Sequence, residues 1–209
     1  LVLAKLRHQP NAVKIDRLHR VLLVNDTPFI PHGVIAGMSE SEWRAWYQKK
    51  TPDLPGRKAF RLQADMGFNS AYYMLHQSFV TKEAEEKLSV VMDIAKSVGM
   101  KIIIYYKSYD YEDNREKWEA ELLDVVGKFK DHPALLAWWV YDEPLLRNIK
   151  WLEGLCESVG KVDPFHPVFV NWCDRGHGWT SEMTEVTGDV CLLDGYYINC
   201  FEQSPNQAW

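Results

Sequence analysis

Short apolar runs recur along this chain at the spacing of a βα repeat. Six runs rich in β-branched and aromatic residues begin near residues 29, 69, 101, 134, 167 and 189, and helical patterns of apolar residues fill most of the intervals. Intervals of about 20–40 residues leave room for a crossover helix, so successive strands pair in parallel through right-handed connections. The rhythm therefore predicts an α/β fold with one parallel sheet.

The number of repeats favours a barrel over an open sheet. A closed (β/α)8 barrel takes about 250 residues, and two more units of about 30 residues would bring this chain to that length. No glycine-rich phosphate loop follows the first strand, which argues against a nucleotide-binding open sheet. We therefore expect a partial TIM barrel with about six βα units visible, and an open doubly wound sheet is the alternative.

The first residues do not share this rhythm. Residues 1–19 are mixed and poorly periodic, so we expect a lead-in from an upstream segment, with the partial barrel domain spanning residues 20–209. From Arg20 to Val34, two apolar runs flank the turn sequence that begins at Asn25. This pattern predicts a β-hairpin whose second arm continues into the first strand of the sheet. Leu1 is not an initiator methionine, and we expect the true start to lie upstream.

Composition limits the kinds of partner. The chain is 46% hydrophobic and 25% charged, as in ordinary globular proteins, and its net charge of −5 with no basic run argues against nucleic acid. No apolar stretch approaches the roughly 18 residues of a membrane span. The four cysteines lack Cys-x-x-Cys spacing, and no His, Asp and Glu set has metal-ligand spacing, so we expect neither a catalytic metal nor a cofactor. A disulfide between Cys173 and Cys200 is conceivable. The oligomeric state and the compartment stay open, with a secreted location suspected.

In a parallel barrel, substrate-binding residues collect where the strands end. We assign to that edge a set of aromatic, acidic and amide side chains: His32, Asn69, Tyr106, Asp142, Glu143, Asn171, Trp172, Asp194 and Tyr196. Aromatic rings can stack on the C–H faces of sugars, while carboxylates and amides bond to sugar hydroxyls. The expected partner is therefore an oligosaccharide, a polysaccharide or a glycoconjugate.

The run from His132 to Pro144 carries the strongest chemical signal. Apolar and aromatic residues continue from Ala134 to Val140 and are followed by a tyrosine, two acids and a proline. Strict alternation places Trp139, Tyr141 and Glu143 on one side of such a strand and Asp142 on the other. If the odd-numbered set faces the barrel axis, Glu143 projects into the mouth under an apolar collar. Burial there would favour the protonated acid that general acid catalysis requires.

This run resembles the fourth-strand segment of a large clan of retaining (β/α)8-barrel glycoside hydrolases, which includes β-galactosidases, β-glucuronidases and cellulases. In that clan the glutamate before the proline is the general acid/base, so the resemblance assigns this role to Glu143. Weaker likenesses lie in Val24–Gly33, in Met66–Asn69 and in Asp194–Ile198, where Tyr196 would lie near the nucleophile. The resemblance covers roughly residues 20–200 and implies hydrolysis of a β-glycosidic bond with retention.

Two departures limit what carries over from the clan. Asp142 stands where the clan has an asparagine, so the hydrogen bond that this asparagine donates to the sugar 2-hydroxyl would have to be accepted instead, or be absent. The clan's nucleophile is a glutamate at the end of the seventh strand, which we expect beyond residue 209. A retaining mechanism needs two carboxyl groups about 5–5.5 Å apart.

Plainer explanations exist for each of these residues. Glu143 could pair with Arg147 one helical turn on, Asp142 could cap the following helix, and His32 could be a packing residue. A non-catalytic carbohydrate-binding or structural protein on the same barrel is the main alternative function. A nucleotide-dependent α/β enzyme is a weaker one, because the glycine-rich loop is missing.

Overall fold

The computed structural model describes residues 9–36, 38–76, 81–107, 114–144, 146–173 and 188–194. Its strands are β1 (Val13–Asp16), β2 (Val21–Val24), β3 (Thr27–Phe29), β4 (Gly33–Ile35), β5 (Ser70–His76), β6 (Lys101–Lys107), β7 (Leu135–Asp142), β8 (Val168–Cys173) and β9 (Val190–Asp194). Its helices are α1 (Glu40–Lys49), α2 (Arg57–Asp65), α3 (Lys82–Ser97), α4 (Arg115–Phe129) and α5 (Ile149–Val162), with a 3₁₀ turn, η2 (Leu146–Asn148).

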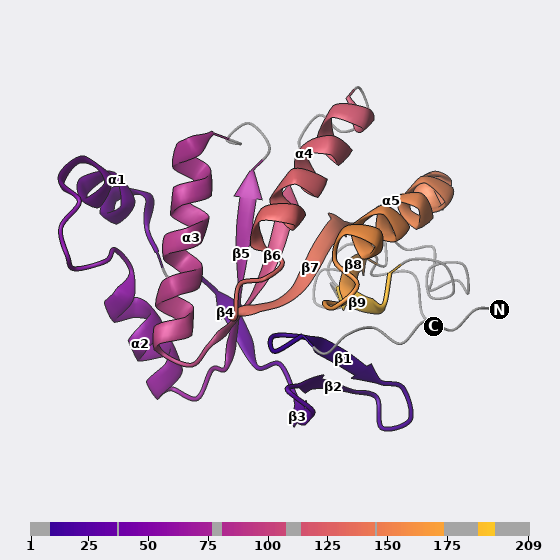
Figure 1. Ribbon diagram of the computed structural model, residues 1–209, viewed down its shortest axis with the longest axis horizontal. Helices are drawn as coiled ribbons and strands as arrows, with labels where there is room; N and C mark the ends of the chain where they lie inside the picture. Colours follow the sequence, from indigo (N-terminus) through magenta and orange to yellow (C-terminus); the bar gives the residue numbers. More distant parts are fainter. Residues whose placement is uncertain are drawn as a thin grey trace, which may run out of the picture.

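Six of these strands form one parallel sheet in chain order, from β4 to β9. The sheet curls, and the helices between the strands pack along its outer side (Figure 1). The parallel sheet predicted from the sequence is confirmed. Five of its strands begin within one residue of the expected positions, but the first, β4, begins at Gly33 rather than near residue 29.

The main core lies between the sheet and the helices. Alternate residues of β6, such as Ile102 and Ile104, point toward the helices and are fully buried. Residues three or four positions apart supply the facing stripe of each helix. These helix residues are Leu88, Val91 and Ile94 of α3, Leu122, Val125 and Val126 of α4, and Leu152, Leu155 and Val159 of α5. The apolar periodicity of the sequence therefore sets which face of each helix is buried.

Strand β1 lies before residue 20, where the sequence predicts the start of the barrel domain. Strand β1 pairs antiparallel with β2, and β2 pairs with β3 through a tight turn in which Asn25 and Asp26 have φ angles of 52° and 61°. Two positive φ angles are typical of a hairpin turn whose twist matches that of its strands, so the predicted hairpin is confirmed. Sequence reasoning missed β1 because four mixed residues give too short a pattern.

The three-stranded sheet packs against the inner side of the curled sheet. Val13 of β1 and Leu22 of β2 belong to a second buried cluster with Leu136, Ala137 and Phe169. In Figure 1 this small sheet lies at the end of the molecule where the strands of the large sheet begin. The small sheet therefore covers part of the inner side at the end where the strands begin.

A buried ion pair ties the amino-terminal segment to the large sheet. The side chains of Asp163 and His166 are fully buried, with 2.8 Å between the Asp163 Oδ2 and His166 Nδ1 atoms. The Nε2 atom of His166 lies 2.9 Å from the carbonyl oxygen of Asn11, just before β1. Both ring nitrogens face acceptors, so the ring that satisfies both carries two N–H groups and a positive charge. The indole of Trp138 in β7 also donates to Asp163, at 2.7 Å.

Gly188, which precedes β9, has a steric reason to be glycine. Its φ is +74°, and a Cβ there would lie 2.8 Å from the carbonyl oxygen of Val168. We expect Gly188→Ala to destabilise the protein by about 1–3 kcal/mol, seen as a lower urea midpoint. Gly154→Ala is the control, because that helical position is open and alanine there stabilises by about 0.5–1 kcal/mol. Equal midpoints for the two variants would contradict this.

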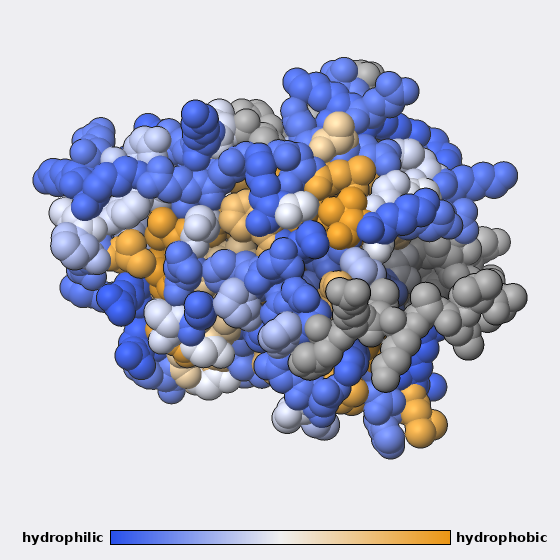
Figure 2. Space-filling model, viewed as in Figure 1, coloured by the Kyte–Doolittle hydropathy of each residue, from blue (hydrophilic) through white to orange (hydrophobic). Residues whose placement is uncertain are grey.

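The face seen in Figure 2 is mostly hydrophilic, with hydrophobic residues showing in the gaps between the helices. Within the described part of the chain, no helix combines the length and the apolar character that crossing a membrane requires.

Candidate active site

A bulge in β7 decides which of its residues face the inner side of the sheet. Trp139 pairs with Phe169 of β8. The next pair along the two strands is Tyr141 with Val170, so Val140 is an extra residue in β7. Beyond the bulge, Asp142 pairs with Asn171. Trp139 and Asp142, three residues apart, therefore both lie on the inner side, while Tyr141 packs on Trp151 of α5. Bulges commonly re-aim a side chain beside a functional site.

Aromatic side chains form a wall next to Asp142. The Trp139 ring stacks on Tyr105 of β6, with ring centroids 4.4 Å apart, and meets Tyr72 of β5 edge-on at 5.5 Å. Burial, and after it the negative charge of Asp142, raises the pKa of Tyr72. Tyr72 and Trp139 are only half-buried, whereas Tyr105 is buried. The wall therefore keeps aromatic surface available to a ligand beside a carboxylate.

Asn171 holds both acids of the β7 ending. Its Nδ2 atom donates to Asp142 Oδ1 at 2.8 Å, and its carbonyl oxygen accepts from the backbone N–H of Glu143 at 2.8 Å. Glu143 has a φ of 49°, a left-handed conformation that side-chain-bearing residues rarely adopt. Unusual backbone angles persist where the surroundings enforce them, and they cluster at active sites. Glu143 itself is half-buried.

Solved structures with a similar fold are glycoside hydrolases. An endo-1,4-β-mannanase from Eisenia fetida matches with a TM-score of 0.59 at 12% identity, over 82% of this chain and 66% of that one. A family 5 mannosidase from Rhizomucor miehei matches with the same TM-score and identity, over 80% of this chain and 62% of that one. A family 2 member from Bacteroides cellulosilyticus reaches 0.59 at 14% identity, over 93% of this chain and 26% of that one.

The fold is a partial TIM barrel. At these identities the likeness concerns the fold alone, and the chain spans less than two thirds of the length of each of these three structures. No protein-family model matches the sequence, and no curated protein matches it. The acids of β7 stand at the carboxyl edge of this barrel, the edge where barrel enzymes place their chemistry.

Two predicted site residues lie at the wrong end of the barrel. His32 and Asn69 come just before β4 and β5, so they stand where the strands begin rather than where they end. Asn69 Oδ1 accepts from the backbone N–H of His32 at 2.8 Å, and its Nδ2 donates to the carbonyl of Ile30 at 2.9 Å. The His32 ring packs at a tilt against the ring of Phe68, with ring centroids 4.7 Å apart. The pair fixes the approach of the chain to β4 and does not lie at the edge where the strands end.

Two further predicted site residues face the helices. Tyr106 is 1% exposed, and its hydroxyl donates to Glu121 of α4 at 2.9 Å. Trp172 is fully buried in the core under the helices. Each is one residue beyond an inward-facing neighbour, Tyr105 or Asn171, so alternation directs it outward. Neither can stack on a ligand at the barrel mouth, and those assignments are corrected.

The alternation expected along β7 is also corrected. Tyr141 and Glu143 were expected on the inner side and Asp142 on the outer side. The extra residue Val140 puts Tyr141 outside and Asp142 inside, so alternation no longer supports an inward-facing Glu143. A continuous apolar run carries no period-two signal, so sequence reasoning could not locate the bulge.

The side chains of two predicted site residues and of one predicted cysteine pair lie outside the part of the chain that the structure describes. Asp194 ends β9 opposite Cys173, at the carboxyl edge, but its side chain is outside the described residues. Tyr196 and Cys200 also lie outside them. Cys156 and Cys191 are free thiols and half-buried, and burial raises the pKa of Cys156 to about 12.

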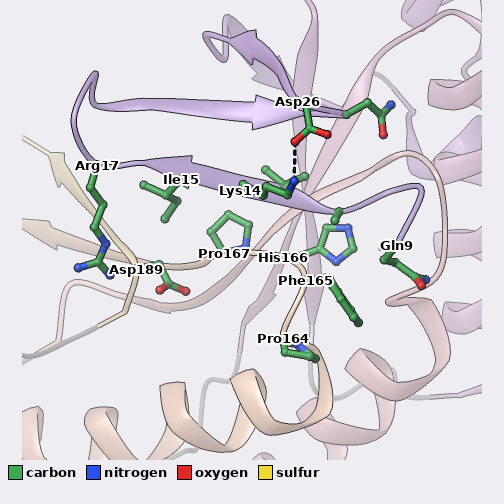
Figure 3. Close-up of a pocket in the computed structure, with 13 residues that line it drawn as sticks. Gln9, Lys14, Ile15, Arg17, Asp26, Pro164, Phe165, His166, Pro167 and Asp189 are labelled. Carbon is green, nitrogen blue, oxygen red and sulfur yellow. Dashed lines mark hydrogen bonds and ion pairs between the residues drawn. The ribbon is translucent and has the colours of Figure 1, made fainter. Parts of the chain in front are cut away.

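A separate hollow of about 500 Å³ opens at the other end of the barrel. Figure 3 shows it between β1 and the segment leading into β8, with the Lys14 and Asp26 ion pair on one side and Phe165 on the other. It lies where β8 and β9 begin, so it is distinct from the mouth that holds Asp142. Among the described residues, no cluster of His, Cys, Asp and Glu could hold a metal ion.

Proposed function

We propose that this chain is part of the catalytic barrel of a glycoside hydrolase that cleaves a β-glycosidic bond with retention. Glu143 acts as general acid/base: it protonates the departing oxygen and then removes a proton from the attacking water. The observation that supports this proposal is the β7 ending, where Asp142 lies beside an aromatic wall and the next residue, Glu143, bonds through its backbone N–H to Asn171.

The roles of the neighbouring residues follow from their chemistry. The half-buried rings of Tyr72 and Trp139 offer faces on which the C–H side of a sugar ring can pack. Asp142 accepts hydrogen bonds from sugar hydroxyls, and Asn171 fixes its carboxylate. Asp194 belongs to the same edge and is proposed as a further contact to the sugar, with Tyr196 beside the nucleophile.

The second carboxylate of the retaining mechanism is proposed to come from a part of the barrel outside these 209 residues. This chain covers 66% of the mannanase and 62% of the mannosidase. If that carboxylate has been lost, the same mouth would bind carbohydrate without cleaving it. A non-catalytic carbohydrate-binding protein is therefore the second candidate.

Aryl glycosides separate the two candidates. The intact protein should release 4-nitrophenol from at least one of the β-glucoside, β-galactoside, β-mannoside or β-glucuronide, and not from the matching α-anomers. Sugar binding without release from any member of this panel would favour the non-catalytic protein. If the protein neither binds nor cleaves any of these glycosides, the carbohydrate assignment is wrong.

A further inference from the structure

Three buried nitrogen donors without acceptors gather where α4 and α5 begin. They are Arg115 Nε and Trp118 Nε1 of α4 and Asn148 Nδ2, immediately before α5, and none has a hydrogen-bond partner in the structure. Buried donors are nearly always satisfied, so a cluster of three calls for an explanation. The remaining unpartnered side-chain atoms among the described residues lie on separate elements: Gln63 on α2, Ser70 on β5 and Trp172 on β8.

Direct contacts link the three donors into one unit. Arg115 donates through a terminal guanidinium nitrogen to Asn148 Oδ1 at 2.9 Å. Its guanidinium also lies 4.9 Å from the centre of the Trp151 ring, which in turn lies 5.5 Å from the Trp118 ring. Residues 115 and 118, and likewise 148 and 151, are three positions apart, so each pair lies on one face of its helix. The two faces meet between α4 and α5.

The local charge is positive and uncompensated within the described residues. No carboxylate lies within ion-pair distance of Arg115 among the residues that the structure describes, whereas Lys117, two residues on, pairs with Glu121. Neither Asn114 nor Asn148, the N-cap residues, caps its helix through its side chain. The first N–H groups of a helix favour anions, so the start of α4 reinforces the guanidinium charge, whereas α5 continues directly from the turn η2.

The three N–H donors need a ligand that only accepts hydrogen bonds. A neutral acceptor such as a hydroxyl oxygen could satisfy one nitrogen, but an oxyanion presents several acceptor oxygens and balances the guanidinium charge. The burial of Asn148 and Trp118, 2% and 1% exposed, would strengthen these charge-assisted contacts.

We propose that the beginnings of α4 and α5 form a binding site for a small oxyanion, either a free sulfate or phosphate ion or the acidic group of a larger ligand. Three side-chain nitrogens, from Arg115, Trp118 and Asn148, supply the contacts. Both helices follow strands of the barrel, α4 after β6 and α5 after β7, so the site lies on the same side of the barrel as Asp142. An acidic sugar bound at the mouth is therefore one source of the oxyanion. The site itself does not depend on hydrolysis.

Calorimetric titration of the intact protein at constant ionic strength tests the site. Sulfate and phosphate should bind, and Arg115→Gln should weaken that binding by at least about tenfold, since charge-assisted hydrogen bonds are the strong ones. Lys117→Gln is the matched control, because it removes an exposed positive charge from the same helix start and leaves the three donors in place. It should change the affinity by less than about twofold.

A conservative second variant distinguishes loss of oxyanion binding from loss of the fold. Trp118→Phe keeps an aromatic ring on Trp151 but removes the indole N–H, so oxyanion binding should weaken several-fold while the unfolding midpoint stays close to that of the unmodified protein. The absence of oxyanion binding to the unmodified protein would overturn the proposal. An equal loss in Lys117→Gln and Arg115→Gln would overturn it too.

A parallel titration shows whether the bound oxyanion is a free ion or the acidic group of a sugar. Glucuronate and a sulfated monosaccharide are compared with free sulfate and with glucose. Tighter binding of the acidic sugars than of free sulfate, lost in Arg115→Gln, would assign the site to an acidic group of a carbohydrate. Equal or weaker binding would assign it to a free ion. Neither outcome bears on whether Glu143 hydrolyses a neutral glycoside, so the two proposals fail separately.

Discussion

Replacing Glu143 with glutamine in the intact protein should lower kcat for β-glycoside hydrolysis by a factor of about 10²–10⁴, the usual contribution of a general acid or base. Glutamine preserves the size of the side chain and the backbone hydrogen bond to Asn171, but it cannot give up or take a proton. The loss should therefore appear in turnover rather than in the unfolding midpoint. Steady-state kinetics beside a thermal melt would measure both.

Glu157→Gln is the matched control for this experiment. Glu157 lies on α5, its side chain is 71% exposed, and its contact with Lys161 is a surface ion pair of small energetic value. It should leave both activity and stability unchanged. Full activity in Glu143→Gln would show that the assignment of the acid/base is wrong, and a collapse of the melt would show a structural role instead.

Replacing His166 with leucine should destabilise the protein by about 3–5 kcal/mol, because it leaves the buried carboxylate of Asp163 without its charged partner. For a chain of this size that loss lowers Tm by roughly 6–20 °C. The double variant with Asp163→Leu should recover part of the loss, since no unpaired charge then remains. If His166→Leu melts like the unmodified protein, the pair does not carry the charge that its geometry implies.

Low pH should weaken the ion pair between Asp163 and His166. Burial alone raises the pKa of Asp163, but hydrogen bonds from His166, Trp138 and Phe165 outweigh it and hold the pKa below its usual value. A lowered folded-state pKa stabilises the fold above the unfolded value of about 3.9, and this stabilisation is lost as pH falls through the folded-state pKa. The stability difference between the unmodified protein and Asp163→Asn should therefore be fully present near pH 5 and shrink as pH falls below about 4.

The fold could be predicted because strand and helix periods differ. The β-branched run of β6 indicates an interior strand, and the three-and-four spacing of apolar residues in α3 indicates an amphipathic helix. Their alternation then dictates a parallel sheet, since crossovers have one hand. Strand β1 was missed because its buried residue, Val13, is buried only through pairing with β2 and contact with β7 and β8.

The candidate site was predicted less well, and for physical reasons. Sequence reasoning found the acids, because Asp142 and Glu143 follow a long apolar run directly. It could not find the extra residue Val140, since an apolar residue fits either face of a strand covered on both sides. Tyr106 and Trp172 were misplaced by a single residue, which reverses the face of a strand. His32 and Asn69 were misplaced because strand starts and strand ends carry similar polar residues.

The leaving-group dependence of Glu143→Gln tests the central claim most directly. A poor leaving group needs a proton from the acid/base, whereas a 2,4-dinitrophenolate leaves without one. The variant should keep a near-normal rate for the first step, transfer of the sugar to the enzyme, on a 2,4-dinitrophenyl β-glycoside. It should lose nearly all of the rate of that step on a methyl or phenyl β-glycoside. An equal loss on both kinds of substrate would contradict proton donation by Glu143.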